Sequence, residues 1–123
     1  MPTTVLVVED DPVIIDLLTL TLELEDWTVL RAKDAVSAFE IARTETPDIV
    51  VSDVMMPGRS GLDLIADLRS DLATQSIPVI LLSARALAAE VAEGYSAGAV
   101  DYVTKPFDPD DLIERIRTVL EAR

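Results

Sequence analysis

The segment Ile49-Val50-Val51-Ser52-Asp53 places a short, continuous run of β-branched residues almost directly before an acidic side chain. Similar runs occur at Val5-Leu6-Val7-Val8 and Val79-Ile80-Leu81-Leu82, with weaker ones at residues 28–30 and 102–104. Short apolar runs rich in valine and isoleucine are typical of strands that are buried on both faces. The sequence therefore predicts five strands of this kind.

Segments of helical length and period separate these runs. Asp11-Pro12 and Asp108-Pro109 each place a capping carboxylate before a proline at the first helical position, and Asp34 can cap another helix. Strands that alternate with helices are typical of a parallel sheet covered by helices. We therefore expect an α/β fold: a doubly wound, five-stranded parallel sheet in the order 2-1-3-4-5, with five helices on both faces.

The composition restricts the chemistry that the chain can perform. Its 123 residues, half of them hydrophobic, suffice for one domain with one core. The absence of cysteine and histidine excludes disulfides, thiolate metal sites and a histidine base. A formal net charge of −13 disfavours direct binding to nucleic acid or anionic membranes. Because no stretch approaches the length of a membrane span, we expect one cytoplasmic domain over residues 1–123, with no membrane insertion and no output domain in this chain.

Reactive side chains follow four of the predicted strands. Residues 9–11, Glu-Asp-Asp, follow the first, Asp53 the third, Ser83 the fourth and Lys105 the fifth. In an open α/β sheet, ligands bind at the carboxyl ends of the strands, where the strand order reverses. We therefore expect three carboxylates to converge on one crevice, those of Asp10, Asp11 and Asp53. Ser83 and Lys105 would lie along its rim.

Such a crevice needs a cation, because two negative charges about 4 Å apart repel by about 4 kcal/mol at an effective dielectric constant of 20. A ligand set made only of oxygen suits Mg²⁺. With the Lys105 ammonium and the Ser83 hydroxyl, this ion would surround a phosphoryl group with positive charge and hydrogen-bond donors. A carboxylate can itself be the nucleophile, and Asp53, alone at its strand end, is the candidate.

Each residue also has a purely structural interpretation. Asp11 suits a helix cap, Asp53 a solvated loop acid, and residues 55–58 an ordinary turn. Tyr102 is most simply a half-buried strand aromatic with its hydroxyl in water. The joint placement of the residues at strand ends favours the functional interpretation.

The sequence resembles the receiver domains of two-component response regulators over essentially its whole length. The similarity rests on the acidic pair Asp10 and Asp11, on residues 53–61 (DVMMPGRSG), on Pro78 to Arg85, and on residues 101–107 (DYVTKPF). Each motif is weak alone, but the four in this order at strand ends are specific.

The resemblance implies that Asp53 accepts a phosphoryl group from a histidine kinase or phosphotransfer protein. It also implies that Mg²⁺ is held by the carboxylates of Asp10, Asp11 and Asp53 and by the backbone carbonyl of Met55. The domain would catalyse only its own phosphorylation and dephosphorylation, and so would not be a free-standing enzyme.

The resemblance further implies a conformational switch. Ser83 would bond one phosphoryl oxygen and move toward it, while Lys105 would pair with another. Tyr102 would turn inward as Ser83 moves, which would reshape the surface of the last two helices and the last strand for a downstream effector or a homodimer. The bond between Lys105 and Pro106 would be cis.

Periodicity marks a possible partner surface on the first helix. Ile14, Ile15, Leu18 and Leu22 fall on one side, and a second apolar stripe falls nearly opposite: Val13, Leu17, Leu20 and Leu24. We expect the first stripe to contact the sheet. The second stripe is either a docking or dimer face, or is buried by flanking helices of the same domain.

Two other functions compete with the phosphorylated switch. A phosphatase of the haloacid dehalogenase type uses similar residues, but its nucleophile follows the first strand and a second acid follows two residues later, whereas position 55 here is methionine. A pseudo-receiver would bind partners without phosphorylation, but usually lacks one of the key residues that are all present here.

Overall fold

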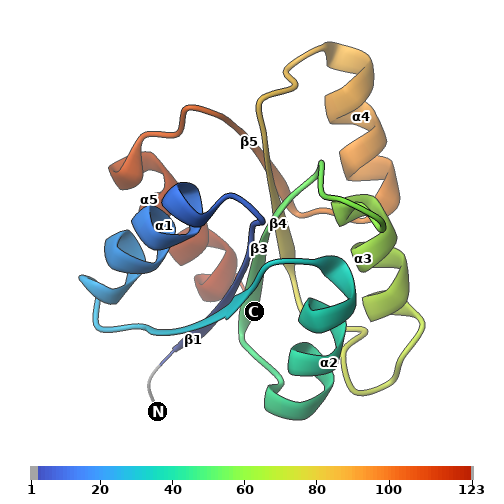
Figure 1. The fold of residues 1–123 in the computed structure, drawn as a ribbon, viewed down its shortest axis with the longest axis horizontal. Helices are drawn as coiled ribbons and strands as arrows, with labels where there is room; N and C mark the ends of the chain where they lie inside the picture. Colours follow the sequence, from blue (N-terminus) through green and yellow to red (C-terminus); the bar gives the residue numbers. More distant parts are fainter. Residues whose placement is uncertain (1–2, 123) are drawn as a thin grey trace.

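Strands and helices alternate along residues 3–122, the part of the chain that the computed structural model describes (Figure 1). The expected domain of residues 1–123 includes residues 1, 2 and 123, which lie outside the described part. The strands are β1 (Thr4–Val8), β2 (Thr28–Ala32), β3 (Ile49–Asp53), β4 (Val79–Ser83) and β5 (Asp101–Thr104). The helices are α1 (Pro12–Glu23), α2 (Ala35–Glu45), α3 (Gly61–Arg69), α4 (Ala88–Ala97) and α5 (Pro109–Glu121).

The five strands form one parallel sheet in the order β2-β1-β3-β4-β5. Val5 of β1 lies opposite both Val29 of β2 and Ile49 of β3. The strand order reverses between β1 and β3, so the carboxyl ends of these two strands flank the expected ligand position. The predicted fold class and strand order are confirmed.

Helices cover both faces of the sheet, with α1 and α5 on one side and α2, α3 and α4 on the other (Figure 1). Successive residues of a strand point to opposite faces. Leu6 and Val50 accordingly belong to the core layer beneath α2 and α3, whereas Val7 and Val51 belong to the layer beneath α1 and α5. Burial on both faces explains the continuous apolar runs in the sequence.

The predicted helix starts are also confirmed. The Asp11 side chain accepts hydrogen bonds from the first amides of α1, and Pro12 occupies the first turn. Asp34 accepts from the Ser37 amide at 2.7 Å, and Asp108 accepts from the Asp110 amide at 2.9 Å. These caps fix where each connection from a strand ends and its helix begins.

The two stripes of α1 have different environments. Ile15, Leu18 and Leu22 are buried against the sheet. The second stripe is exposed, with relative accessibilities of 74% for Val13, 49% for Leu17, 61% for Leu20 and 75% for Leu24. The alternative that flanking helices bury both stripes is therefore wrong.

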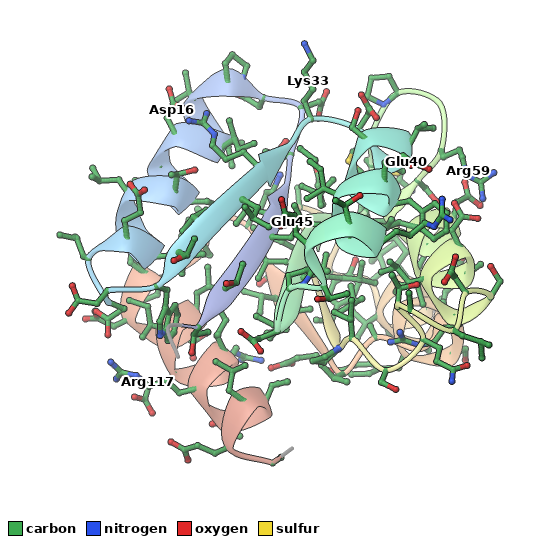
Figure 2. All side chains as sticks on the ribbon, turned by 90° about the horizontal axis from the view of Figure 1, so that it is seen from below. Asp16, Lys33, Glu40, Glu45, Arg59 and Arg117 are labelled. Carbon is green, nitrogen blue, oxygen red and sulfur yellow. The ribbon has the colours of Figure 1, made fainter. Side chains whose placement is uncertain are left out.

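Most charged side chains outside the carboxyl edge of the sheet lie on the surface of the domain. Figure 2 labels six residues with exposed side chains: Asp16, Lys33, Glu40, Glu45, Arg59 and Arg117. None of the helices in residues 3–122 is both long enough and apolar enough to span a membrane.

Candidate functional site

Glu9 is the first residue after β1, in the connection to α1. Its amide donates to the Ala32 carbonyl at 3.0 Å, which continues the hydrogen bonding between β1 and β2 by one residue. The Glu9 side chain is only 1% exposed; its Oε1 accepts from Lys105 Nζ at 2.6 Å, and its Oε2 accepts from the Asp11 amide at 3.1 Å. Glu9 is therefore a buried carboxylate that is satisfied by both a charge and an amide.

Asp53 ends β3 and is 8% exposed. Its Oδ2 lies 3.1 Å from Lys105 Nζ, and its Oδ1 accepts from the Met55 amide at 3.3 Å. A Cβ atom at Gly61 would lie 2.4 Å from the Asp53 carbonyl oxygen. Only glycine allows α3 to start this close to the backbone of Asp53.

Lys105 joins the two buried carboxylates. Its amide donates to the Ser83 carbonyl at 2.8 Å, and the Lys105-Pro106 peptide bond is cis, as predicted. Burial works against the charged ammonium, but the hydrogen bond to Glu9 and the charge of Asp53 outweigh it and raise the pKa of Lys105. Burial also raises the pKa of Glu9, against the effect of Lys105. Lys105 is thus a cation at neutral pH, in contact with both Glu9 and Asp53.

Three carboxylates form the acidic group of the site. Oxygen atoms of Glu9, Asp10 and Asp53 lie within 4.8 Å of one another. One lysine cannot neutralise three such charges, and the ligand atoms are all hard oxygen donors. The residues therefore fit a small divalent cation such as Mg²⁺.

The structure corrects the prediction that Asp11 belongs to this group. Its Oδ1 accepts from the amides of Val13 at 2.9 Å and Ile14 at 3.3 Å, so the carboxylate faces the start of α1. The reason is physical: the first amides of a helix have no partners within the helix, and an aspartate at this position satisfies them. The capping interpretation of Asp11-Pro12 is the one that holds.

Glu9 takes the place that the sequence analysis gave to Asp11. The length of the first strand could have indicated this. Glu9 is the first polar residue after four apolar ones, and its amide still hydrogen-bonds to the neighbouring strand. A residue that continues a buried strand shares its burial, whereas a residue that caps a helix faces its amides.

Of the remaining predicted residues, Ser83 and Met55 lie at the same edge of the sheet, whereas Tyr102 lies within β5. Ser83 ends β4, is 1% exposed, and accepts at Oγ from the Arg85 amide at 3.0 Å. Met55 follows Asp53 closely and has an exposed side chain. Tyr102 is buried, at 8% exposure, and its hydroxyl donates to the Arg85 carbonyl at 2.8 Å. The expectation that Tyr102 is half-buried with its hydroxyl in water is therefore wrong.

These features define an α/β domain whose site, at the carboxyl edge of a parallel sheet, offers carboxylates to a cation and an ammonium to an anion. The family model for the response regulator receiver domain matches residues 5–117. The chain belongs to this family, and it is a receiver domain of two-component phosphorelay signalling.

Curated relatives agree with the assignment. The chain is 43% identical over 119 residues to the probable transcriptional regulatory protein TcrX of Mycobacterium tuberculosis, which covers 97% of this chain and 50% of TcrX. It is 47% identical over 118 residues to the transcriptional regulatory protein CseB of Streptomyces coelicolor, which covers 96% of this chain and 49% of CseB. The chain thus spans about half the length of these relatives.

Solved structures show the same fold over whole chains. A putative response regulator from Chloroflexus aurantiacus superposes with a TM-score of 0.94 at 33% identity and covers 100% of both chains. The chemotaxis protein CheY4 of Vibrio cholerae superposes with a TM-score of 0.91 at 27% identity and covers 97% of this chain and 99% of that one.

Proposed function

We propose that Asp53 accepts a phosphoryl group from a histidine kinase or phosphotransfer protein, and that Mg²⁺ is required. The observation that carries this proposal is the Lys105 ammonium, which contacts Asp53 at 3.1 Å and Glu9 at 2.6 Å beside an exposed third acid, Asp10. The site thus pairs a nucleophilic carboxylate with a fixed cation for the incoming phosphoryl oxygens.

The Mg²⁺ ligands in this proposal are the carboxylates of Asp10 and Asp53 and the backbone carbonyl of Met55, with Glu9 rather than Asp11 as the further acid. When bound, the ion supplies positive charge to the phosphoryl oxygens. Membership of the receiver family supports this role, and the donor set of the acidic group fits it. Family membership likewise supports a cytoplasmic location.

In the transfer, an Asp53 carboxylate oxygen forms a bond to phosphorus as the bond from phosphorus to the donor breaks. With phosphohistidine as donor, the released imidazole nitrogen takes up a proton; with acetyl phosphate, acetate leaves. Lys105 stays protonated and holds a phosphoryl oxygen, and Ser83 donates its hydroxyl to another. The domain therefore needs no general base, and its chemistry is limited to its own phosphorylation and dephosphorylation.

The test is the intact mass of the protein after incubation with acetyl phosphate, with and without Mg²⁺. We expect one added phosphoryl group that depends on Mg²⁺ and is absent from Asp53→Asn. Asp48→Asn, an acid at the opposite edge of the sheet beside the start of β3, serves as the control and should still be phosphorylated. No addition to the wild-type protein would favour the pseudo-receiver alternative; family membership already excludes the haloacid dehalogenase alternative.

The exposed stripe of α1 is proposed as the face that docks a helix of the phosphodonor protein. Val13, Leu17, Leu20 and Leu24 expose a row of apolar side chains on the helix that starts directly after the acidic loop. Apolar side chains grouped in this way indicate an interaction site. A partner bound along α1 therefore lies close to Asp53.

Phosphotransfer from purified histidine kinase cores tests this surface. Leu17→Glu and Leu20→Glu should slow transfer from a kinase at least tenfold and leave phosphorylation by acetyl phosphate unchanged, an estimate that corresponds to about 1.4 kcal/mol of binding. Leu72→Glu is the control, because Leu72 is 87% exposed at the opposite edge of the sheet. Unchanged kinase transfer and an unchanged oligomeric state would remove α1 as a partner face.

A further inference from the structure

Gly94 lies in the interior of α4, where the helix passes over the ring of Tyr102. A Cβ atom built at Gly94 would lie 2.9 Å from Cδ2 and 3.1 Å from Cε2 of Tyr102, and 3.1 Å from Cδ1 of Leu81. Real Cβ atoms essentially never approach another heavy atom within 3.0 Å. A side chain at position 94 and the inward ring of Tyr102 cannot both occupy this space.

Backbone conformation does not explain the glycine. Among the described residues, the glycines with positive φ are Gly58 and Gly98, so Gly94 has a φ that any residue adopts. In the interior of a helix, glycine lowers the folding equilibrium roughly fivefold relative to alanine. The feature of this position that requires glycine is the close approach of α4 to the Tyr102 ring, which supplies the nearest atom, and to the Leu81 methyl group.

Tyr102 connects α4 to the loop that follows Ser83. Its hydroxyl donates to the Arg85 carbonyl at 2.8 Å, and the Arg85 amide donates to Ser83 Oγ at 3.0 Å. These contacts run from the strand end that carries Ser83, through Arg85 and the Tyr102 ring, to the backbone of α4 at Gly94. Each step is a direct contact between neighbouring groups.

We propose that Gly94 is a positioning residue for Tyr102. Because Gly94 has no side chain, α4 can pack closely on the inward ring of Tyr102. The position of α4 therefore depends on Tyr102, which is hydrogen-bonded to the loop after Ser83. Any side chain at position 94 displaces the ring, moves α4 outward, or does both. A role of this packing in switching rests on the proposed phosphorylation of Asp53. The packing of Gly94 on Tyr102 does not depend on phosphorylation.

A double-mutant cycle in urea tests the proposal without phosphorylation. Ala92→Gly measures the helix preference of alanine on the exposed side of α4, where we expect a roughly fivefold loss in the folding equilibrium constant. Helix preference alone would make Gly94→Ala raise the folding equilibrium constant by the same factor. We expect Gly94→Ala to lower this constant instead. In a Tyr102→Val background, which removes the ring, the same Gly94→Ala change should raise the constant by up to about fivefold, because only the Leu81 methyl group then remains close to the new Cβ.

The cycle also covers variants that do not fold. Loss of folding in Gly94→Ala that Tyr102→Val restores supports the proposal. A roughly fivefold gain from Gly94→Ala in the presence of the ring overturns it. A loss that is equal with and without the ring also overturns it, because the ring would then not be the group that Gly94 accommodates.

Ring contacts provide a readout that a general loss of stability would not change. The chain has two tyrosines, so in Tyr95→Phe the tyrosine ring signals come from Tyr102 alone. We expect nuclear Overhauser contacts from the Tyr102 ring to the Leu81 methyl groups and to the Gly94 α-protons in this protein. After Gly94→Ala we expect the ring to lose its contacts with Leu81, with residue 94, or with both. Retention of both sets of contacts after the Gly94→Ala change overturns the proposal. Acetyl phosphate labelling of the same samples tests the phosphorylation of Asp53 separately.

Discussion

Acidic residues at the ends of strands and acidic residues at the starts of helices are held in different ways. Glu9 and Asp53 lie at the carboxyl edge of the sheet, close to Asp10, and share one lysine. Asp11 and Asp34 instead accept amide hydrogen bonds at the first turn of a helix. A helix start satisfies a carboxylate by itself, whereas the strand-end acids depend on cations supplied from elsewhere.

The largest expected effect on stability is the removal of the shared cation. Lys105→Met leaves Glu9 and Asp53 buried without their counter-charge, and we expect the free energy of unfolding in the absence of metal to fall by about 3 kcal/mol. Urea denaturation measures this loss. Lys33, the other lysine of the chain, is exposed, so Lys33→Met should change the same quantity by less than about 0.5 kcal/mol. Equal losses for the two variants would show that the ion pairs of Lys105 do not contribute to the free energy of unfolding.

The second effect separates two neighbouring acids. At a concentration about 100 times its dissociation constant, Mg²⁺ should raise the free energy of unfolding by about 2.7 kcal/mol. Asp10→Asn should abolish most of this gain. Asp11→Asn should keep it, because asparagine caps a helix as well as aspartate does. Denaturation with and without Mg²⁺ provides the measurement, and loss of the gain in Asp11→Asn would restore the original prediction that Asp11 is a ligand.

The smallest effect concerns a cap and its pH dependence. The hydrogen bond from the Ser37 amide lowers the pKa of Asp34. A carboxyl with a lower pKa in the folded state stabilises the protein above its unfolded-state pKa of about 4, and this contribution is lost as the pH falls further. Asp34→Ala should therefore cost about 1 kcal/mol at pH 7 and less as the pH falls from about 5 toward 3.

Denaturation at several pH values tests the assignment, with Asp34→Asn as the control. Asparagine keeps the cap but does not titrate. The difference in free energy of unfolding between Asp34→Asn and Asp34→Ala should therefore stay the same as the pH falls. A constant difference between the wild-type protein and Asp34→Ala would mean that the carboxylate charge is irrelevant to the cap.

The sheet and most of the site were predictable because they follow from local rules. Apolar runs identify the strands, Asp11, Asp34 and Asp108 identify helix starts, and parallel strands bring their carboxyl ends to one edge. These rules brought Asp53 and Lys105 together correctly. They depend on residue type and order along the chain, which the sequence states directly.

The directions in which side chains face at the end of a strand were not predictable in the same way. Glu9, Asp10 and Asp11 are adjacent acids, and only the hydrogen bond of the Glu9 amide to Ala32 and the start of α1 decide which carboxylate faces which way. The inward position of Tyr102 likewise depends on Gly94, a residue of a different element. Such contacts between elements require the packed structure.

All-parallel topology has a consequence for engineering. The connections at the carboxyl edge carry the reactive groups, whereas those at the opposite edge connect each helix to the next strand. The longest of the latter, residues 70–78 between α3 and β4, carries Leu72 with its side chain 87% exposed. A fluorescent reporter inserted beside Leu72 would extend a surface loop, where insertions are best tolerated. The sheet would separate such an insertion from Asp53, so the reporter would leave the proposed phosphoryl acceptor unobstructed.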